Sequence, residues 1–220
     1  PPSARPPWVG YWSSPDRGLV HLLGAWPRIR RAVPEARLRV YYSVRKYIEN
    51  ARFASCNGRA AYMANAVDYW LDRLGPREGV DLVDALPRRT LAREQLRCRV
   101  MCYPCNADGY TEGFGQSVPE AMLAGCLPIV RCADAFADLW ADGVWRLEAD
   151  PASAAFEDEI VEKVVLGLTS WSGCGDSWPA QAELRALAGR WPWSRAAESA
   201  ERAIRLACGL RRSQAEEAAA

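Results

Sequence analysis

The chain has 220 residues, of which 50% are hydrophobic and 25% are charged, and its formal net charge is +1. This balance is typical of a globular protein and excludes the strongly basic surface expected of a nucleic-acid-binding protein. We therefore expect no nucleic-acid partner. No apolar run is long enough to span a membrane, so we also expect no membrane span.

Strand-like and helix-like segments alternate along the chain. Short apolar or aromatic segments predict strands over Trp8–Trp12, Arg37–Val44, Gly79–Leu86, Cys98–Pro104, Leu127–Arg131 and Val144–Glu148. Apolar residues at helical spacing predict helices from Ser14 to the break at Pro34, and over Arg59–Gly75, Thr90–Arg97, Ser117–Gly125, Asp134–Trp140, Ala152–Leu168, Gln181–Ala188 and Ser194–Cys208. The stretch Arg45–Gly58 has no clear pattern, and we expect the last eight residues to fray.

This alternation predicts an α/β fold with a doubly wound parallel sheet, Rossmann-like, covered by helices on both faces. We interpret residues 1–220 as a single domain, because the sequence shows no internal repeat and no clear second domain. Ligands of such folds bind outside the carboxyl ends of the strands, so candidate site residues are sought there.

The eight cysteines are interpreted mainly as small core residues, because a chain of this length does not need disulfides. Cys102 and Cys105 have the spacing of a zinc or redox pair, but the only histidine, His21, is far away in sequence. We therefore predict no metal and no cofactor. A reducing, cytoplasmic location is the default expectation.

The segment after the fourth predicted strand has the pattern of an anion site. Gly113, Phe114 and Gly115 form a glycine turn, and Ser117 with Glu120 has the spacing of a capping box that starts a helix. A helix N-terminus offers unpaired N–H groups to a phosphate. The alternative is a capped helix that binds nothing.

Glu112 and Arg17 are the two charged candidates at the same edge of the sheet. Glu112 lies in the loop before the helix and has no evident structural role; a surface acid is the alternative. Ser14 as N-cap and Pro15 place Arg17 in the first turn of the first helix, where a cation is unfavourable unless an anion binds. An ion pair with Asp16 is the alternative for Arg17.

Several motifs are absent from the sequence. There is no G-x-G-x-x-G after the first strand, no P-loop, and no G-x-S-x-G elbow. These absences argue against a dinucleotide-dependent oxidoreductase, a P-loop nucleotidase and an α/β-hydrolase.

The segments from Trp8 to about Pro151 together resemble the C-terminal, donor-binding domain of the GT-B glycosyltransferases, most closely glycosyltransferase family 4 (glycosyl transferases group 1). The main match is EGFGQSVPEAMLAGCLPIV, which carries the family's pair of glutamates separated by seven residues as Glu112 and Glu120. The resemblance implies a nucleoside diphosphate sugar as donor substrate, of UDP or GDP type, and transfer with retention.

The resemblance also implies roles for individual residues. It implies that Glu120 binds the ribose hydroxyls, that Glu112 contacts the donor sugar and that Arg17 neutralises the diphosphate. It places the backbone around Gly113, Phe114, Gly115, Ser117 and Val118 near the sugar and diphosphate, and the nucleobase near Leu86.

The chain departs from the family pattern at several points: Pro119 inside the motif is less usual, Arg45–Gly58 has no counterpart, and two further departures bear on the site. No lysine follows the first strand, so the second phosphate-binding cation has no match; Lys46 is the one lysine near this edge. The N-terminal domain, which the family uses for the acceptor, has no counterpart, so we expect it in a longer chain. Two hypotheses follow: a glycosyltransferase domain with an unknown acceptor, or a non-catalytic module that binds a nucleotide sugar or a partner protein.

Overall fold

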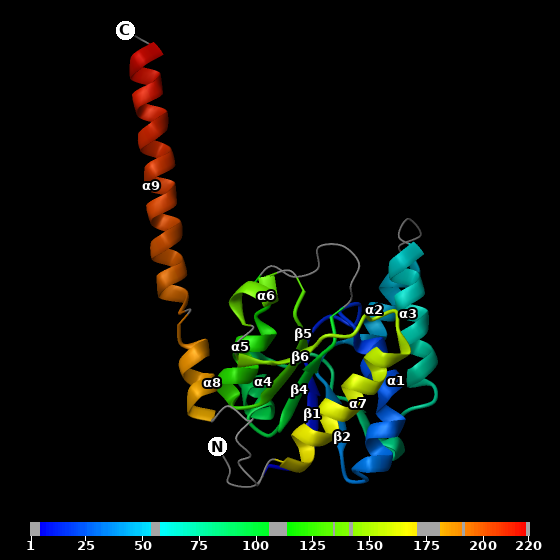
Figure 1. The fold of residues 1–220 in the computed structure, drawn as a ribbon. Helices are drawn as coiled ribbons and strands as arrows, with labels where there is room; N and C mark the ends of the chain where they lie inside the picture. Colours follow the sequence, from blue (N-terminus) through cyan, green and yellow to red (C-terminus); the bar gives the residue numbers. More distant parts are fainter. Residues whose placement is uncertain are drawn as a thin grey trace.

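The computed structural model describes residues 5–53, 58–105, 114–133, 135–140, 143–170, 181–190 and 192–218. A six-stranded sheet of order β3-β2-β1-β4-β5-β6 forms its centre, and all neighbouring strands are parallel (Figure 1). The strands are β1 (Trp8–Tyr11), β2 (Arg37–Val40), β3 (Val80–Leu82), β4 (Val100–Tyr103), β5 (Leu127–Arg131) and β6 (Trp145–Leu147). The predicted doubly wound parallel sheet is confirmed, with most strands shorter than predicted.

The helices cover both faces of the sheet. They are α1 (Leu19–Ala32), α2 (Val44–Phe53), α3 (Gly58–Leu71), α4 (Arg88–Gln95), α5 (Ser117–Ala124), α6 (Ala135–Leu139), α7 (Ala154–Thr169), α8 (Gln181–Ala188) and α9 (Trp193–Ala218). α1 packs against α3 and α7, and α5 packs against α4 and α8, so these two groups cover opposite faces (Figure 1). A short 3₁₀ helix, η1 (Pro76–Glu78), precedes β3.

Burial explains why this arrangement is stable. All four residues of β4 are buried, as expected for a central strand covered on both faces. On α1, the predicted apolar stripe is fully buried, including Leu22, Trp26 and Ile29. Each such side chain contributes about 1.5–3 kcal/mol relative to exposure.

The order of the strands reverses between β1 and β4. The chain runs outward from β1 through β2 to β3, and then crosses back to β4 on the other side of β1. In doubly wound sheets the ligand crevice lies at this reversal, at the carboxyl ends of the strands. The segments that follow β1 and β4 therefore border the expected site.

The start of the first helix differs from the prediction. α1 begins at Leu19, after Gly18 with φ 93°, and Ser14 does not cap it. The residues from Pro15 to Gly18 form a turn instead, closed by a hydrogen bond from the Arg17 N–H to the Ser14 carbonyl at 2.9 Å. The left-handed backbone at Gly18 interrupts the helix, so Arg17 lies in the turn before α1.

The capping box predicted at α5 is also absent. α5 begins at Ser117 as predicted, but its N-cap is Gln116, without a side-chain capping bond. The Glu120 side chain accepts hydrogen bonds from α4 instead of capping its own helix. Tertiary partners therefore override the local capping pattern.

One helix was not predicted, and two other boundaries were predicted wrongly. The unassigned stretch after β2 contains α2, α3 ends at Leu71 and not at Gly75, and α4 begins at Arg88, after Pro87, without Thr90 as cap. The expected fraying is also wrong over most of the tail, because α9 continues to Ala218 and extends away from the sheet (Figure 1). Among the helices of the described ranges, none is both long and apolar enough to cross a membrane.

Candidate functional site

A cleft of about 760 Å³ lies between α4 and α5 and reaches the carboxyl end of β1. Its polar and aromatic lining includes Trp12, Ser13, Arg88, Gln95, Ser117 and Glu120. Its volume is in the range of pockets that bind small molecules and cofactors. The cleft therefore lies at the edge of the sheet where the sequence predicts the site.

Glu120 is held in this cleft by two donors from α4. Arg88 Nη1 donates to Glu120 Oε1 at 3.2 Å, and Gln95 Nε2 donates to Oε2 at 3.1 Å. Gln95 is itself buried, with 4% of its surface exposed, whereas 27% of the Glu120 side chain is exposed. A carboxylate has about four acceptor positions, so each oxygen retains capacity for another donor. Glu120 is thus oriented and still able to bind a ligand hydroxyl.

The segment after β1 forms the end of the cleft. The indole Nε1 of Trp12 donates to the Ser117 carbonyl at 3.1 Å, which ties the β1 end to the first turn of α5. Ser13 Oγ donates to the Tyr103 hydroxyl at 3.1 Å, which ties it to the end of β4. These two bonds bring together the ends of the strands on either side of the strand-order reversal.

Arg88 and Gln95 were not singled out from the sequence. The signal for Arg88 was present: it starts a helix at the carboxyl edge of the sheet, where a cation is unfavourable without an anion. Arg88 also donates to the Gln116 side chain at 3.2 Å. No pattern in the sequence indicates Gln95 as a site residue, because its contact with Glu120 depends on how α4 packs against α5.

Gly115 is required by packing within the protein. It has φ 65°, and a Cβ atom built on it would lie 1.6 Å from Cε1 of the buried Phe136 ring. The glycine turn predicted a close approach of a ligand here, but the Phe136 ring occupies that side. The turn before α5 is therefore held by contact with α6.

Arg17 does not line the cleft between α4 and α5. It lies in the turn before α1, with its Nε 3.9 Å from Asp16 Oδ2, so the ion pair considered as an alternative is present. A Cβ on Gly18 would lie 2.8 Å from the Cys105 backbone nitrogen, which places this turn against the end of β4. Arg17 is thus close to the start of the loop after β4.

The remaining residues that the sequence predicts for the site pack against other parts of the protein. Phe114 packs edge-on against Trp140, with ring centroids 5.3 Å apart, and its carbonyl accepts from the Trp140 indole at 3.0 Å. Val118 is fully buried, and its N–H donates to the Gly115 carbonyl at 3.0 Å. Leu86 packs against the core beside α4 and does not line the cleft.

Glu112 and Gly113 lie outside the residues that the structure describes. The predicted roles of Glu112 and Gly113 near the donor sugar and diphosphate therefore stay predictions.

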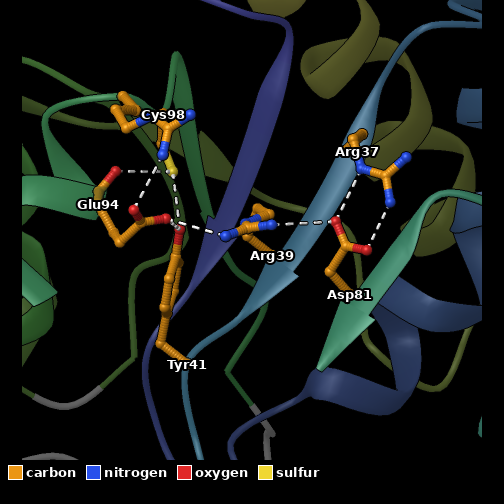
Figure 2. Close-up of polar contacts among 7 residues, drawn as sticks. Arg37, Arg39, Tyr41, Asp81, Glu94 and Cys98 are labelled. Carbon is orange, nitrogen blue, oxygen red and sulfur yellow. Dashed lines mark hydrogen bonds and ion pairs between the residues drawn. The ribbon is translucent and has the colours of Figure 1, made fainter. Parts of the chain in front are cut away.

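A charged network holds α4 in position on the sheet (Figure 2). Glu94 on α4 accepts hydrogen bonds from Arg39 at 3.0 Å, Arg97 at 3.0 Å and the Tyr41 hydroxyl at 3.2 Å. Arg39 also donates to Asp81 on β3 at 3.3 Å. Since α4 supplies Arg88 and Gln95 to the cleft, this network positions one of its walls.

Aromatic and ionic contacts extend the same network across β1, β2 and β3. The guanidinium carbons of Arg39 and Arg97 lie 4.6 Å and 4.2 Å from the centre of the Trp8 ring, within cation–π range. Arg37 binds Asp81 with two hydrogen bonds of 2.8 Å and 2.5 Å. Cation–π and bidentate contacts hold these side chains in defined positions.

The network lowers the pKa of its carboxylates. Partial burial alone raises the pKa of Glu94, but hydrogen bonds from Arg39 and Arg97 outweigh it and hold the pKa below its usual value. A carboxyl group whose pKa is lower in the folded state stabilises the fold above its unfolded pKa, and this stabilisation is lost as the pH falls through the folded value.

We expect Glu94→Gln to lower the free energy of unfolding by about 1–3 kcal/mol at pH 7, because three donors lose a charged acceptor. The difference from the unchanged protein should shrink as the pH falls below the ordinary pKa of a glutamate, about 4.3, and through the lower folded pKa of Glu94. Urea unfolding at pH 7 and pH 3 measures both values. Glu49→Gln, at an exposed carboxylate of α2, is the control and should have no effect at either pH. A Glu94→Gln difference that is the same at both pH values would contradict the role of the charge.

The cysteines of the core are buried, including Cys98, Cys102, Cys105 and Cys126. Burial raises the pKa of Cys98 to about 12 and raises that of Cys102 further. They behave as apolar core residues, as predicted. Within the described ranges, no group of three or more histidine, cysteine, aspartate or glutamate side chains is arranged to hold a metal.

Comparison with solved structures identifies the fold. The chain is similar to HepE from Anabaena in complex with UDP and glucose, with a TM-score of 0.61 and 17% identity over 85% of this chain and 44% of that one. It is also similar to the sucrose-phosphate synthase of Thermosynechococcus elongatus, with a TM-score of 0.62 and 17% identity over 95% and 47% of the two chains.

A third similar structure is the pneumococcal O-GlcNAc transferase GtfA in complex with UDP and GlcNAc, with a TM-score of 0.57 and 15% identity over 91% and 36% of the two chains. The sheet and its helices match the C-terminal half of GT-B glycosyltransferases. The chain spans less than half of the length of each of these proteins. No family model and no curated protein sequence matches the chain.

Proposed function

We propose that this chain is the nucleotide-sugar-binding half of a glycosyltransferase, with a donor of UDP or GDP type. The observation that carries the proposal is the orientation of Glu120 by Arg88 and Gln95 in the cleft beside the strand-order reversal. A fixed carboxylate is an acceptor suited to the two neighbouring hydroxyls of a ribose. Two of the structures with this fold contain UDP and a sugar.

The motif of two glutamates in this segment supports a finer assignment to glycosyltransferase family 4 and transfer with retention. In this proposal Glu112 contacts the donor sugar, and Arg17 with the turn before α1 stabilises the leaving diphosphate. Catalysis is then mainly electrostatic, because fixed charges and backbone N–H groups stabilise the charge that develops on the leaving group. The acceptor is bound partly or wholly by a further domain.

A non-catalytic nucleotide-sugar-binding module is the second candidate, because the groups oriented in the cleft, Glu120 with Arg88 and Gln95, are binding groups, and Arg17 does not line that cleft. Binding and turnover distinguish the two candidates. The enzyme hypothesis expects sugar transfer, or donor hydrolysis, once this chain is combined with the rest of its protein. Tight donor binding without turnover in that longer protein would favour the module.

Thermal unfolding with a panel of nucleoside diphosphates and their sugars tests donor binding. A ligand at about 100 times its Kd stabilises the folded state by about 2.7 kcal/mol, which corresponds to roughly 5–10 °C for a chain of this size. We expect such a rise in Tm with UDP or GDP and with one of their sugars, and none with NAD. A protein that responds to no nucleoside diphosphate would contradict the proposed function.

A further inference from the structure

Gln95, on α4, is a buried amide that lines the cleft between α4 and α5. Among the amide side chains that the structure describes, it is the only buried one. Within the described ranges, its side chain has one hydrogen-bond partner, the Glu120 carboxylate, to which Nε2 donates at 3.1 Å. Burying an amide costs about as much free energy as one hydrogen bond to a charged group contributes. A methionine would fill the same space without that cost, so the amide matters more for Glu120 than for the fold.

The backbone of Gln95 is fixed at the end of α4. Its carbonyl accepts hydrogen bonds from the Cys126 thiol at 3.0 Å and from the Cys98 N–H at 3.1 Å. Both cysteines are fully buried and lie just before β5 and β4, so the end of α4 is tied to the sheet. A side chain on such a rigid element holds its partner more precisely than one on a loop. Gln95 is thus a rigid support for the carboxylate.

The two oxygens of the Glu120 carboxylate have different supports. Oε1 accepts from Arg88, whose side chain is 76% exposed, at 3.2 Å. An exposed arginine holds such a contact weakly, because water competes for it and the long side chain loses freedom. Oε2 accepts from the buried Gln95. The orientation of the carboxylate therefore depends mainly on Gln95.

A carboxylate held in one orientation can bind two neighbouring hydroxyls at once. Each oxygen of Glu120 has one protein donor and retains capacity for another. A carboxylate that is free to rotate would lose this freedom when it binds two hydroxyls, which lowers the affinity. A single hydroxyl gains less from a fixed carboxylate, because it can bond to either oxygen in several orientations.

We propose that Gln95 is a positioning residue that, through Glu120, makes the cleft selective for ribonucleotides over 2′-deoxyribonucleotides. The identification of the ligand as a nucleotide rests on the proposed function, whereas the preference for two neighbouring hydroxyls does not. The selectivity is moderate, because 27% of the Glu120 side chain is exposed and water can replace a missing hydroxyl.

Calorimetric titration of the full chain with UDP, GDP and their 2′-deoxy analogues tests this inference. We expect the nucleotide that binds to do so about tenfold more tightly than its 2′-deoxy analogue, as for one hydrogen bond to a charged group. In Gln95→Met this ratio should fall to about twofold, because binding of the ribonucleotide weakens and that of the deoxy analogue hardly changes. Ribose 5-phosphate and 2-deoxyribose 5-phosphate repeat the comparison without a nucleobase.

Urea unfolding separates a positioning role from a structural one. We expect Gln95→Met to be as stable as the unchanged protein, because methionine fills the same space and water can reach the partly exposed Glu120. Gln95→Glu is a second variant, in which two like charges side by side should also weaken binding of the ribonucleotide. Asn50→Leu removes an exposed amide from α2 and should change neither the stability nor the ratio.

The outcomes separate this inference from the proposed function. If UDP or GDP binds no more tightly than its 2′-deoxy analogue, or if Gln95→Met keeps the same ratio, the inference is overturned and the proposed function stands. An equal loss of affinity for both kinds of nucleotide would also overturn it, because it indicates a structural role. If neither UDP nor GDP binds, but ribose 5-phosphate shows a Gln95-dependent preference over its 2-deoxy analogue, the proposed function fails and the selectivity for neighbouring hydroxyls remains. If none of these ligands binds, both fail.

Discussion

Replacing Glu120 with glutamine is expected to weaken binding of UDP or GDP about tenfold or more. The carboxylate is held by Arg88 and Gln95, and a charge-assisted hydrogen bond from a ribose hydroxyl to it contributes about 1.5–3 kcal/mol. Glutamine has nearly the same shape, but it removes the charge and turns one acceptor into a donor that faces other donors. Calorimetry with UDP and GDP measures the change.

The control for this experiment is Glu162→Gln. Glu162 is an exposed carboxylate of α7, which packs with α1 on the opposite face of the sheet, so the same chemical change there should leave affinity unaltered. Urea unfolding should show that Glu120→Gln remains folded, because the Gln95 amide can turn to offer its oxygen. If the folded Glu120→Gln variant binds UDP and GDP with unchanged affinity, Glu120 does not bind the ribose hydroxyls.

Replacing Gly115 with alanine is expected to lower the free energy of unfolding by about 2–5 kcal/mol. The left-handed backbone, with φ 65°, costs an L-residue about 1–2 kcal/mol, and the methyl group would overlap the Phe136 ring, which costs about 1–3 kcal/mol more. Because this turn precedes α5, the position of Glu120 depends on it. Urea denaturation at neutral pH measures the loss.

Two further variants separate the backbone cost from the overlap. In a Phe136→Ala background the ring is gone, so adding Gly115→Ala should cost only about 1–2 kcal/mol. Gly58→Ala is the matched control: a Cβ there meets no atom within 4 Å, so the change should be neutral or slightly stabilising. An equal cost of Gly115→Ala in both backgrounds would show that the ring is not responsible.

The fold could be predicted from the sequence because its signals are local and repeated. Apolar segments such as Cys98–Pro104 and the stripe that includes Leu22 and Trp26 have strand or helix periodicity regardless of their partners. Element boundaries were less predictable. Ser14 has the pattern of a helix cap, but the left-handed Gly18 starts α1 four residues later than that cap position implies.

Part of the candidate site could also be predicted from the sequence. Glu120 was found because a glutamate at that spacing, after a glycine turn and a buried strand, matches a motif. Its partners could not be found this way. Arg88 and Gln95 are distant from Glu120 in sequence and reach it only because α4 packs against α5.

The sequence by itself determined the alternation of strands and helices along the chain, apart from α2, and also the buried faces and the segment that holds Glu120. These depend on periodicity and turn chemistry, which act over a few residues. Only the tertiary structure decided what Glu120 and Gly115 contact: α4 donors replace the predicted capping box, and the Phe136 ring occupies the side of the glycine turn. The reason is that contacts between neighbouring helices on one face of the sheet are set by how those helices pack, which no local pattern encodes.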